Sequence, residues 1–208
     1  MSELLYLKAS PRGKESASGK LADIFVEKWR TYNPDAIVTS RGVSPDDVEG
    51  PDQEWVEANI ATAGQRTEDQ RRKLAKSDEY IDELRRASHI IIATPMYNFS
   101  IPWNLKAYID NIVREGETFS FSAEEGHGPL LPEGKKLLLL WTAAGDYSPG
   151  SDFADYDFLT PTVACTYGFM GVTDFSVIPV GNREEAPELA QATLRACHAQ
   201  IDQLCTKW

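Results

Sequence analysis

The chain has 208 residues, of which 42% are hydrophobic and 10% aromatic, so it is long enough to bury one sizeable core. Its 21 Lys and Arg residues against 32 Asp and Glu residues give a net charge of −11, which argues against nucleic acid and anionic membrane surfaces as partners. No apolar run approaches the roughly 20 residues of a bilayer span, and the N-terminus lacks a basic start followed by a long apolar stretch. We therefore expect a soluble, cytoplasmic protein with a single domain over residues 1–208.

Continuous apolar runs bounded by Gly, Pro or Ser predict five β-strands. The runs fall within residues 3–10, 36–43, 88–97, 135–145 and 172–181. Runs without polar alternation are typical of strands that are covered on both faces, as in a parallel sheet.

Helical periodicity predicts the elements that cover this sheet. Leu21, Phe25, Trp29 and Tyr32 form one apolar stripe, and residues 105–112 and 184–205 carry similar stripes. Residues 67–88 have few apolar anchors, which predicts a helix with a wide solvated face. The Pro-, Gly- and acid-rich stretch 44–54 is expected to be a disordered or inserted loop. The alternation of strands and helices predicts a doubly wound α/β sheet with right-handed crossovers.

The cysteine and histidine residues show no spacing typical of a metal site. Cys197 and Cys205 lie eight residues apart in the last predicted helix, which separates them by about 12 Å along its axis. That distance is too long for a disulfide bond. We therefore expect neither a structural metal nor a bond between these two cysteines.

The stretch SPRGKESASGK, residues 10–20, joins the first predicted strand to the first predicted helix. In open α/β sheets, ligands bind beyond the carboxyl ends of the strands. Ser10, Ser16 and Ser18 offer hydroxyl groups there, and the start of the helix adds backbone N–H donors and the positive end of the helix dipole. The stretch lacks the spacing of a nucleoside triphosphate loop, a GxGxxG motif and a nucleophilic cysteine. Two interpretations stay open on these residues: a monophosphate site, or a Ser-rich turn with a helix N-cap.

A second loop, PMYNF at residues 95–99, follows the third predicted strand. Met96 and Phe99 provide apolar walls, Tyr97 a wall with a hydroxyl group, and Asn98 a donor and an acceptor, which suits a flat amphipathic ring. Each residue also has an ordinary structural explanation, since apolar residues after a buried strand usually join the core and an Asn before a helix can cap it. Their position at the same sheet edge as the hydroxyl-rich loop favours a ligand site.

PMYNF followed by IPWNLKAYID resembles the flavin-binding loop of the FMN-dependent NADH azoreductases. This is a family of flavodoxin-like NAD(P)H:quinone oxidoreductases, to which an acyl-carrier-protein phosphodiesterase activity was once attributed. The likeness extends to ETFSFS, LLLLWTAAGDYSPG and GFMGVTDFSVIPVG, and so covers most of the chain. It implies a flavodoxin-like three-layer fold with a five-stranded parallel sheet of order 2-1-3-4-5, bound FMN, NAD(P)H as the electron donor and a homodimer.

Carried over residue by residue, the resemblance implies two sets of contacts. The cofactor-binding residues would be Ser10, Ser16, Ala17, Ser18, Met96, Tyr97, Asn98, Phe99, Thr142, Ala143, Ala144 and Gly145. The substrate-binding residues would be Phe121, Tyr167 and Asn98. Ala143 and Ala144 stand where family members often have an arginine and a second glycine, which leaves the range of acceptors open.

Four further residues near these loops are expected to have ordinary roles. Trp103 and Tyr147 are large aromatic side chains, which more often pack in a core or an interface than contact a substrate. Arg12 and Lys14 are expected to be solvated charges rather than ligands of the phosphate.

The cofactor would carry the chemistry, so no general acid or base is expected. The resemblance implies that NAD(P)H passes a hydride to the flavin and leaves, and that a quinone or an azo compound then accepts two electrons at the same face. This alternation predicts ping-pong kinetics, with backbone donors near Ala144 and Gly145 stabilising charge on the reduced ring. Two other functions stay open: a flavodoxin-type electron carrier without NAD(P)H oxidation of its own, and a flavin-free phosphodiester hydrolase.

Overall fold

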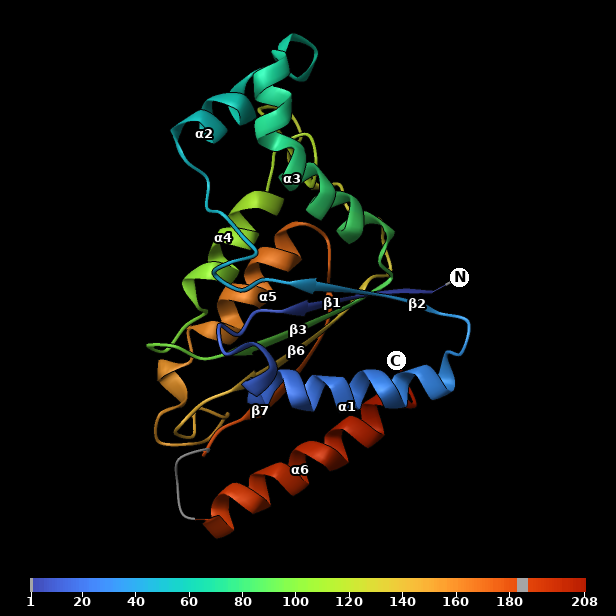
Figure 1. Ribbon diagram of the computed structural model, residues 1–208, viewed down its shortest axis with the longest axis vertical. Helices are drawn as coiled ribbons and strands as arrows, with labels where there is room; N and C mark the ends of the chain where they lie inside the picture. Colours follow the sequence, from blue (N-terminus) through green and yellow to red (C-terminus); the bar gives the residue numbers. More distant parts are fainter. Residues whose placement is uncertain (1, 183–186) are drawn as a thin grey trace.

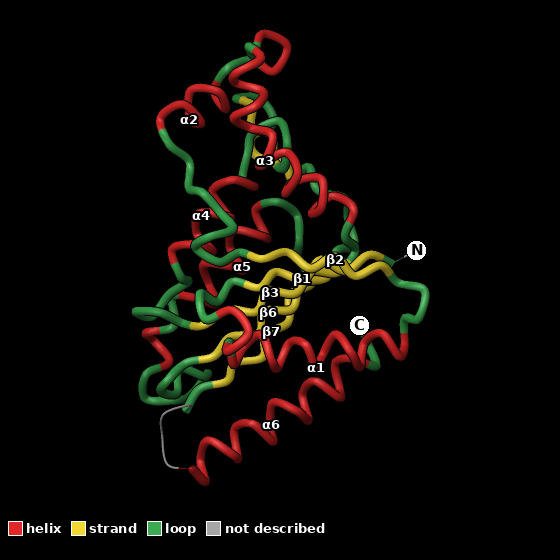
Figure 2. Tube along the Cα trace, viewed as in Figure 1, coloured by secondary structure: helices red, strands yellow, loops and turns green. Residues whose placement is uncertain are grey.

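The centre of the protein is a five-stranded parallel β-sheet (Figure 1, Figure 2). The computed structural model describes residues 2–182 and 187–208. In sheet order the strands are β2 (Ile37–Gly42), β1 (Glu3–Lys8), β3 (His89–Pro95), β6 (Lys136–Thr142) and β7 (Asp174–Val180). All neighbouring strands are parallel, which confirms the five predicted strands and their order 2-1-3-4-5.

The central strands are apolar along their whole length because both faces of the sheet are covered. Ile90 and Ile92 of β3 belong to the core on one face, and Ile91 belongs to the core on the other. Leu139 and Leu140 of β6 are divided between the two faces in the same way. Since successive side chains of a strand point to opposite faces, a strand buried on both sides needs an unbroken apolar run.

Helices cover the two faces in separate layers (Figure 1). α1 (Ala17–Tyr32) and α6 (Pro187–Cys205) lie on one face, and α3 (Glu68–Arg86), α4 (Trp103–Ile112) and α5 (Leu159–Phe169) lie on the other. This confirms the three-layer fold. None of the helices in the described part of the chain has the length and hydropathy of a membrane-spanning segment.

The predicted apolar stripe of α1 is correct for all but its last member. Leu21, Phe25 and Trp29 are buried against the sheet, but Tyr32 is 60% exposed. Tyr32 is the final residue of α1, and at this end of the helix the stripe no longer packs on the sheet. Residues 184–186 of the last predicted helix lie outside the described residues.

The sequence pattern did not predict α2 (Gln53–Ile60), α5, or the hairpin that β4 (Phe119–Ser122) forms with β5 (Gly126–Pro129). Of the two expectations for residues 44–54, the structure fits an inserted loop, which is ordered and leads into α2 at Gln53. The carboxylate of Asp47 accepts hydrogen bonds from the N–H and hydroxyl of Ser44, at 3.1 and 2.6 Å. Val48 is buried in the core, and Asp52 caps α2 by accepting from the N–H of Trp55. Hydrogen bonds within the stretch and the buried side chain of Val48 therefore stabilise one conformation of this loop.

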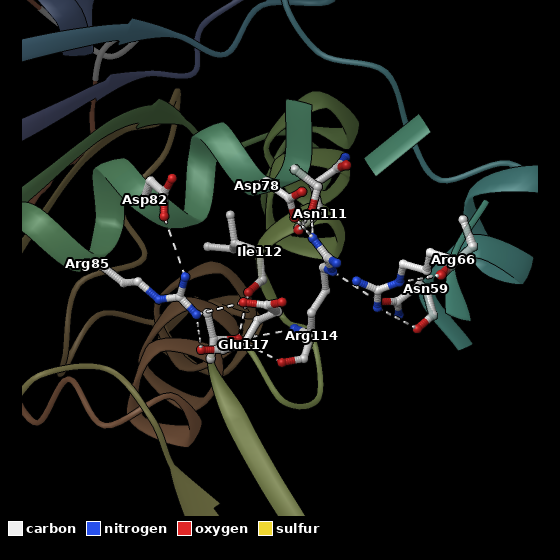
Figure 3. A network of polar contacts seen from close by, with 12 residues as sticks. Asn59, Arg66, Asp78, Asp82, Arg85, Asn111, Ile112, Arg114 and Glu117 are labelled. Atoms are coloured by element: carbon white, nitrogen blue, oxygen red, sulfur yellow. Dashed lines mark hydrogen bonds and ion pairs between the residues drawn. The ribbon is translucent and has the colours of Figure 1, made fainter. Parts of the chain in front are cut away.

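A fully buried arginine links α2 to the sheet-covering helices (Figure 3). The Nε of Arg114, just after α4, donates to the side chain of Asn59 at 2.9 Å, and its Nη1 donates to the Ser77 hydroxyl at 2.9 Å. Nη1 also pairs with the carboxylate of Asp78, and the guanidinium lies 5.9 Å from the centre of the Trp55 ring. A buried charge is tolerated only with such partners, so this network fixes α2 against α3.

Candidate functional site

Three of the loops singled out in the sequence meet at one edge of the sheet. They follow β1, β3 and β6, which are adjacent, so their carboxyl ends lie side by side. A cavity of about 390 Å³ lies between them. It is lined by Ser10, Arg12, Ser16, Ala17, Pro95, Met96, Tyr97, Thr142, Ala143 and Ala144. The tertiary structure therefore gathers most of the predicted cofactor-binding residues around one cavity.

The hydroxyl-rich loop is also a helix cap. The Ser16 hydroxyl accepts a hydrogen bond of 3.0 Å from the N–H of Gly19, which makes Ser16 the N-cap of α1. The N–H groups of Ala17 and Ser18 lie in the first turn, where they have no carbonyl partner within the helix. The two interpretations of this stretch are therefore compatible, since a capped helix start still presents free N–H donors and a positive dipole end to the cavity.

Ser18 differs from the other predicted residues of this loop. It is 1% exposed, and its hydroxyl lies 3.0 Å from that of Ser16. It is absent from the cavity lining. Ser18 therefore does not line the cavity itself. Its hydroxyl contacts the hydroxyl of Ser16, which does.

The cavity contains one charged residue that was expected to be merely solvated. Arg12 lines it together with Ser10, whose hydroxyl accepts a hydrogen bond of 3.3 Å from the Arg12 N–H. Lys14 instead lines a neighbouring cavity of about 370 Å³ on the other side of the same loop. A sequence cannot separate these two neighbours, because the turn between them decides which side chain faces the site.

The ring loop is a tight turn built on the end of β3. The N–H of Met96 donates to the carbonyl of Thr142 at 2.8 Å, and Tyr97 and Ser100 exchange two backbone bonds of 3.0 Å. Asn98 and Phe99, at the tip, have φ angles of 47° and 72°. A positive φ is strained for a residue as bulky as Phe, so the turn holds Phe99 in a costly conformation. Met96 and Tyr97 face the cavity, while Asn98 and Phe99 lie outside its lining.

The segment after β6 closes the third side of the cavity. The N–H of Ala143 donates a hydrogen bond of 3.1 Å to the carbonyl oxygen of Val180, the last residue of β7. The backbone hydrogen bonds found in the described part of the chain do not use the N–H groups of Ala144 and Gly145, which leaves them free as donors. Gly145 is not a lining residue but follows directly, and its carbonyl accepts from the N–H of Asn182 at 3.1 Å.

A carboxylate lies immediately beyond this segment. Asp146 accepts hydrogen bonds from the hydroxyl and the N–H of Ser148, at 2.6 and 2.9 Å. These bonds hold the pKa of Asp146 below its usual range. The side chain is therefore ionised at neutral pH, close to where the cavity closes.

The predicted substrate-binding residues are not brought together. Tyr167 is fully buried among core residues and lies outside the cavity lining, and burial raises the pKa of its phenol. Its role as a substrate contact stays a prediction. Tyr167 follows Val163 by four residues, so both side chains lie on the buried face of α5, a helix that the sequence pattern did not predict. Phe121 lies on the β4–β5 hairpin, 64% exposed and outside the cavity lining. Trp103, expected to pack in a core or interface, is 61% exposed.

The chemistry of the lining fits FMN. One end carries hydroxyl groups, the start of a helix and the guanidinium of Arg12, which together suit a phosphate dianion. The other end carries the side chains of Met96 and Tyr97 opposite the free N–H of Ala144, which suits a flat ring with a polar edge. The volume of about 390 Å³ falls in the range of roughly 300–1,000 Å³ for small-molecule sites.

The fold and the cavity define a flavodoxin-like α/β protein with a cavity at the carboxyl edge of the sheet. Comparison with known proteins agrees: a family model described as a flavodoxin-like fold matches residues 2–204. The chain belongs to this flavodoxin-like family.

The chain is also similar to individual proteins and solved structures within this fold. An FMN-dependent NADH:quinone oxidoreductase from Nostoc sp. is 33% identical over 208 residues, covering 100% of both chains. A relative of the same name from Acidobacterium capsulatum is 37% identical over 185 residues, covering 89% of this chain and 88% of the relative. The crystal structure of an azoreductase from Bacillus anthracis str. Sterne superimposes with a TM-score of 0.88 at 25% identity, with both chains fully covered.

Proposed function

We propose that the protein is an FMN-dependent oxidoreductase that takes electrons from NADH or NADPH and delivers them to quinones and azo compounds. The cavity carries this proposal, because phosphate-type donors at the start of α1 and the walls of the ring loop line the same space. Relatives that are 33% and 37% identical are FMN-dependent NADH:quinone oxidoreductases, which supports it. We propose further that residues 1–208 act as one domain.

In this proposal the side chains and the backbone bind and orient, and the cofactor reacts. When bound, FMN supplies the two-electron chemistry, accepting a hydride from the reduced nicotinamide and passing electrons to the acceptor. Ser10, Ser16 and the N–H of Ala17 hold the phosphate, and Arg12 balances its charge. Met96 and Tyr97 shield one side of the ring from water.

The backbone donors have the electrostatic role. The N–H groups of Ala144 and Gly145 would donate to the polar edge of the ring, where negative charge develops on reduction. Because these donors are fixed by the bond between Ala143 and Val180, they need no rearrangement when the charge appears. No side chain is assigned as a general acid or base.

We also propose that the protein acts as a homodimer in the cytoplasm. Trp103, the first residue of α4, is 61% exposed, and a second copy packed on this helix would cover it. Sedimentation of the purified protein distinguishes the two states: a mass near 46 kDa, twice the 23.2 kDa of one chain, is expected, and a mass of one chain would reject the dimer. The cytoplasmic location stays a sequence-based prediction.

The main experiment identifies the cofactor and measures turnover. The chromophore is released by heat, identified by mass, and the apo protein is titrated with FMN and FAD. We expect FMN, tighter binding of FMN than of FAD, and rapid NADH or NADPH oxidation in the presence of menadione. A flavin-loaded protein that does not oxidise either nucleotide would indicate an electron carrier, and a colourless protein that does not bind FMN would favour the hydrolase.

A double variant tests where the ring binds. Tyr97→Ala with Asn98→Ala removes the wall and the tip of the ring loop, and we expect FMN retention to fall at least about tenfold. Ile60→Ala, at a 79% exposed position on α2, is the control and leaves retention unchanged. Unchanged flavin content in the double variant would contradict the placement of the ring.

A further inference from the structure

Four aromatic side chains form a closed cycle beside the ring loop. Phe99 contacts Tyr147 and Tyr156, with 6.0 and 5.4 Å between ring centres. Phe153 contacts the same two rings, at 6.4 and 6.2 Å. Each of these rings therefore has two neighbours in the cycle, hereafter the aromatic cluster.

The aromatic cluster adjoins the proposed cofactor cavity. A Cβ placed on Gly145 would lie 3.6 Å from the ring of Tyr147, so this ring packs against the segment that closes the cavity. The N–H of Phe158 donates to the carbonyl of Phe99 at 3.0 Å, which ties the loop after β6 to the tip of the ring loop. The cluster is thus anchored at two points next to the site.

Three of the four rings of the aromatic cluster are exposed to solvent, and the fourth, Tyr147, is half-buried. Phe99, Phe153 and Tyr156 are 44%, 56% and 49% exposed. Exposed aromatic side chains are normally covered by a partner or used for recognition when several of them are contiguous. Phe99 takes its φ of 72° at the tip of the turn between Tyr97 and Ser100, and this turn fixes the position of one of the four rings.

The charge around the aromatic cluster is negative. Between Lys136 and Arg183 the sequence contains no basic residue, whereas residues 146–157 contain the aspartates Asp146, Asp152, Asp155 and Asp157. Among the residues that the structure describes, no ion pair involves Asp152 or Asp155, which are both exposed. The cation–π contacts found among the residues that the structure describes involve rings outside the aromatic cluster. The cluster therefore has aromatic faces and nearby carboxylates but no cation of its own.

We propose that the aromatic cluster is a binding site for an organic cation, such as a quaternary ammonium or an N-alkylated aromatic group. The face of each ring is negative and attracts a cation placed within about 6 Å of its centre. Quaternary cations are weakly hydrated and cannot donate hydrogen bonds, so aromatic faces replace their water at little cost. The neighbouring carboxylates add long-range attraction that salt would screen.

The site would also determine which acceptors the enzyme prefers. This part of the inference rests on the proposed function. An acceptor that lies over the cofactor and carries a cationic substituent would reach the aromatic cluster, whereas a sulfonated acceptor would meet the carboxylates. We therefore expect the flavin-loaded protein to prefer cationic over anionic azo dyes of similar size. Binding of a cation requires no turnover. The cation site and the proposed oxidoreductase function can therefore be rejected independently of each other.

The test compares two probes of equal shape and different charge, choline and its neutral analogue 3,3-dimethylbutan-1-ol. Binding to the FMN-loaded protein is followed by NMR shifts of ¹³C-labelled Phe and Tyr rings. We expect choline to bind about tenfold more tightly than the alcohol, and Phe153→Leu or Tyr156→Leu to remove most of this difference. Asp155→Asn should weaken choline binding about two- to threefold at low salt. Tyr32→Leu and Asp35→Asn, at exposed positions near the end of α1, are the matched controls and leave binding unchanged.

Three outcomes would overturn the proposal. Equal affinity for the charged and the neutral probe would show that the rings do not select charge. Unchanged choline binding in both ring variants would place the cation elsewhere. A second copy of the chain covering the rings would prevent binding and would appear as a change in sedimentation of the Phe153→Leu variant.

Discussion

Asn104, the second residue of α4, donates a hydrogen bond of 2.8 Å from its side-chain amide to the carbonyl oxygen of Ala9. Ala9 directly follows β1 and leads into the hydroxyl-rich loop. The same amide nitrogen donates to the carbonyl of Val43 beyond β2, and the side chain is 1% exposed. One buried amide thus joins the helix that follows the ring loop to the strand ends that precede the phosphate side of the cavity.

Asn104→Ala leaves two buried carbonyl groups without their donor. We expect the free energy of unfolding to fall by about 2 kcal/mol. Because the two loops lose their common support, the Kd for FMN should rise about tenfold. Urea unfolding and fluorescence titration of the apo protein measure the two effects. Lys106→Ala, which removes an exposed ion pair with Asp110 on the same helix, should change neither by a comparable amount. If the variant loses stability but its Kd for FMN is unchanged, Asn104 stabilises the fold and does not contribute to FMN binding.

Ser16→Ala separates capping from phosphate binding. Loss of the cap on α1 should destabilise the protein by about 1 kcal/mol. If Ser16 also holds the phosphate, the affinity for FMN should fall several-fold while the affinity for riboflavin, which has no phosphate, stays the same. Thr67→Ala removes the capping box of α3, far from the cavity lining, and should cost similar stability without any effect on FMN. Parallel losses for FMN and riboflavin would argue against a phosphate contact.

His89 makes stability depend on pH. It is half-buried between Trp29 and Trp208, and this burial, with the nearby charge of Lys136, lowers its pKa to about 4. The unfolded chain has the ordinary histidine pKa of about 6.5, so it binds more protons than the folded protein between these values. The stability that comes from a neutral His89 is complete above pH 6.5 and is lost as the pH falls towards 4. Because solvent screens this half-buried ring, the loss is about 2 kcal/mol rather than the full value of about 3 kcal/mol that the two pKa values would give.

Unfolding of the wild type and of His89→Gln, measured between pH 7 and pH 4, checks this expectation. The variant should lose about 2 kcal/mol less over that interval, because glutamine does not titrate. His198→Gln on α6 is the control and should follow the wild type. Parallel curves for the wild type and His89→Gln would mean that the ring gains a proton in the folded protein as easily as in the unfolded chain.

Gly181→Ala tests the support of the closing segment. A Cβ at this position would lie 2.6 Å from the Gly145 carbonyl oxygen and 3.1 Å from the Cα of Asp146, so the backbone has to move. We expect a loss of about 1–3 kcal/mol in stability, together with a several-fold rise in the Kd for FMN as the N–H donors shift. Gly64→Ala, where a Cβ meets no atom within 4 Å, should be tolerated in both measurements. Tight FMN binding by Gly181→Ala would show that the donors of this segment are not needed.

The sequence by itself determined the sheet and the position of its loops. A strand buried on both faces requires a continuous apolar run, so runs such as the isoleucines of β3 were visible without any tertiary information. The loops after those strands share one sheet edge by topology, which brought Ser16, Met96 and Thr142 to one cavity as expected. Their binding of FMN stays a prediction that the experiments above test.

Only the tertiary structure decided which side chains face that edge. Arg12 faces the cavity and Lys14 does not, because one turn separates them. Tyr167 points into the core because α5 presents that side to the sheet, and the four rings of the aromatic cluster meet only when the loop after β6 folds onto the ring loop. Asn104 joins residues that are 95 and 61 positions earlier in the chain. Local patterns encode burial along one element, whereas contacts between loops depend on how separate elements pack, and no single stretch of sequence records that packing.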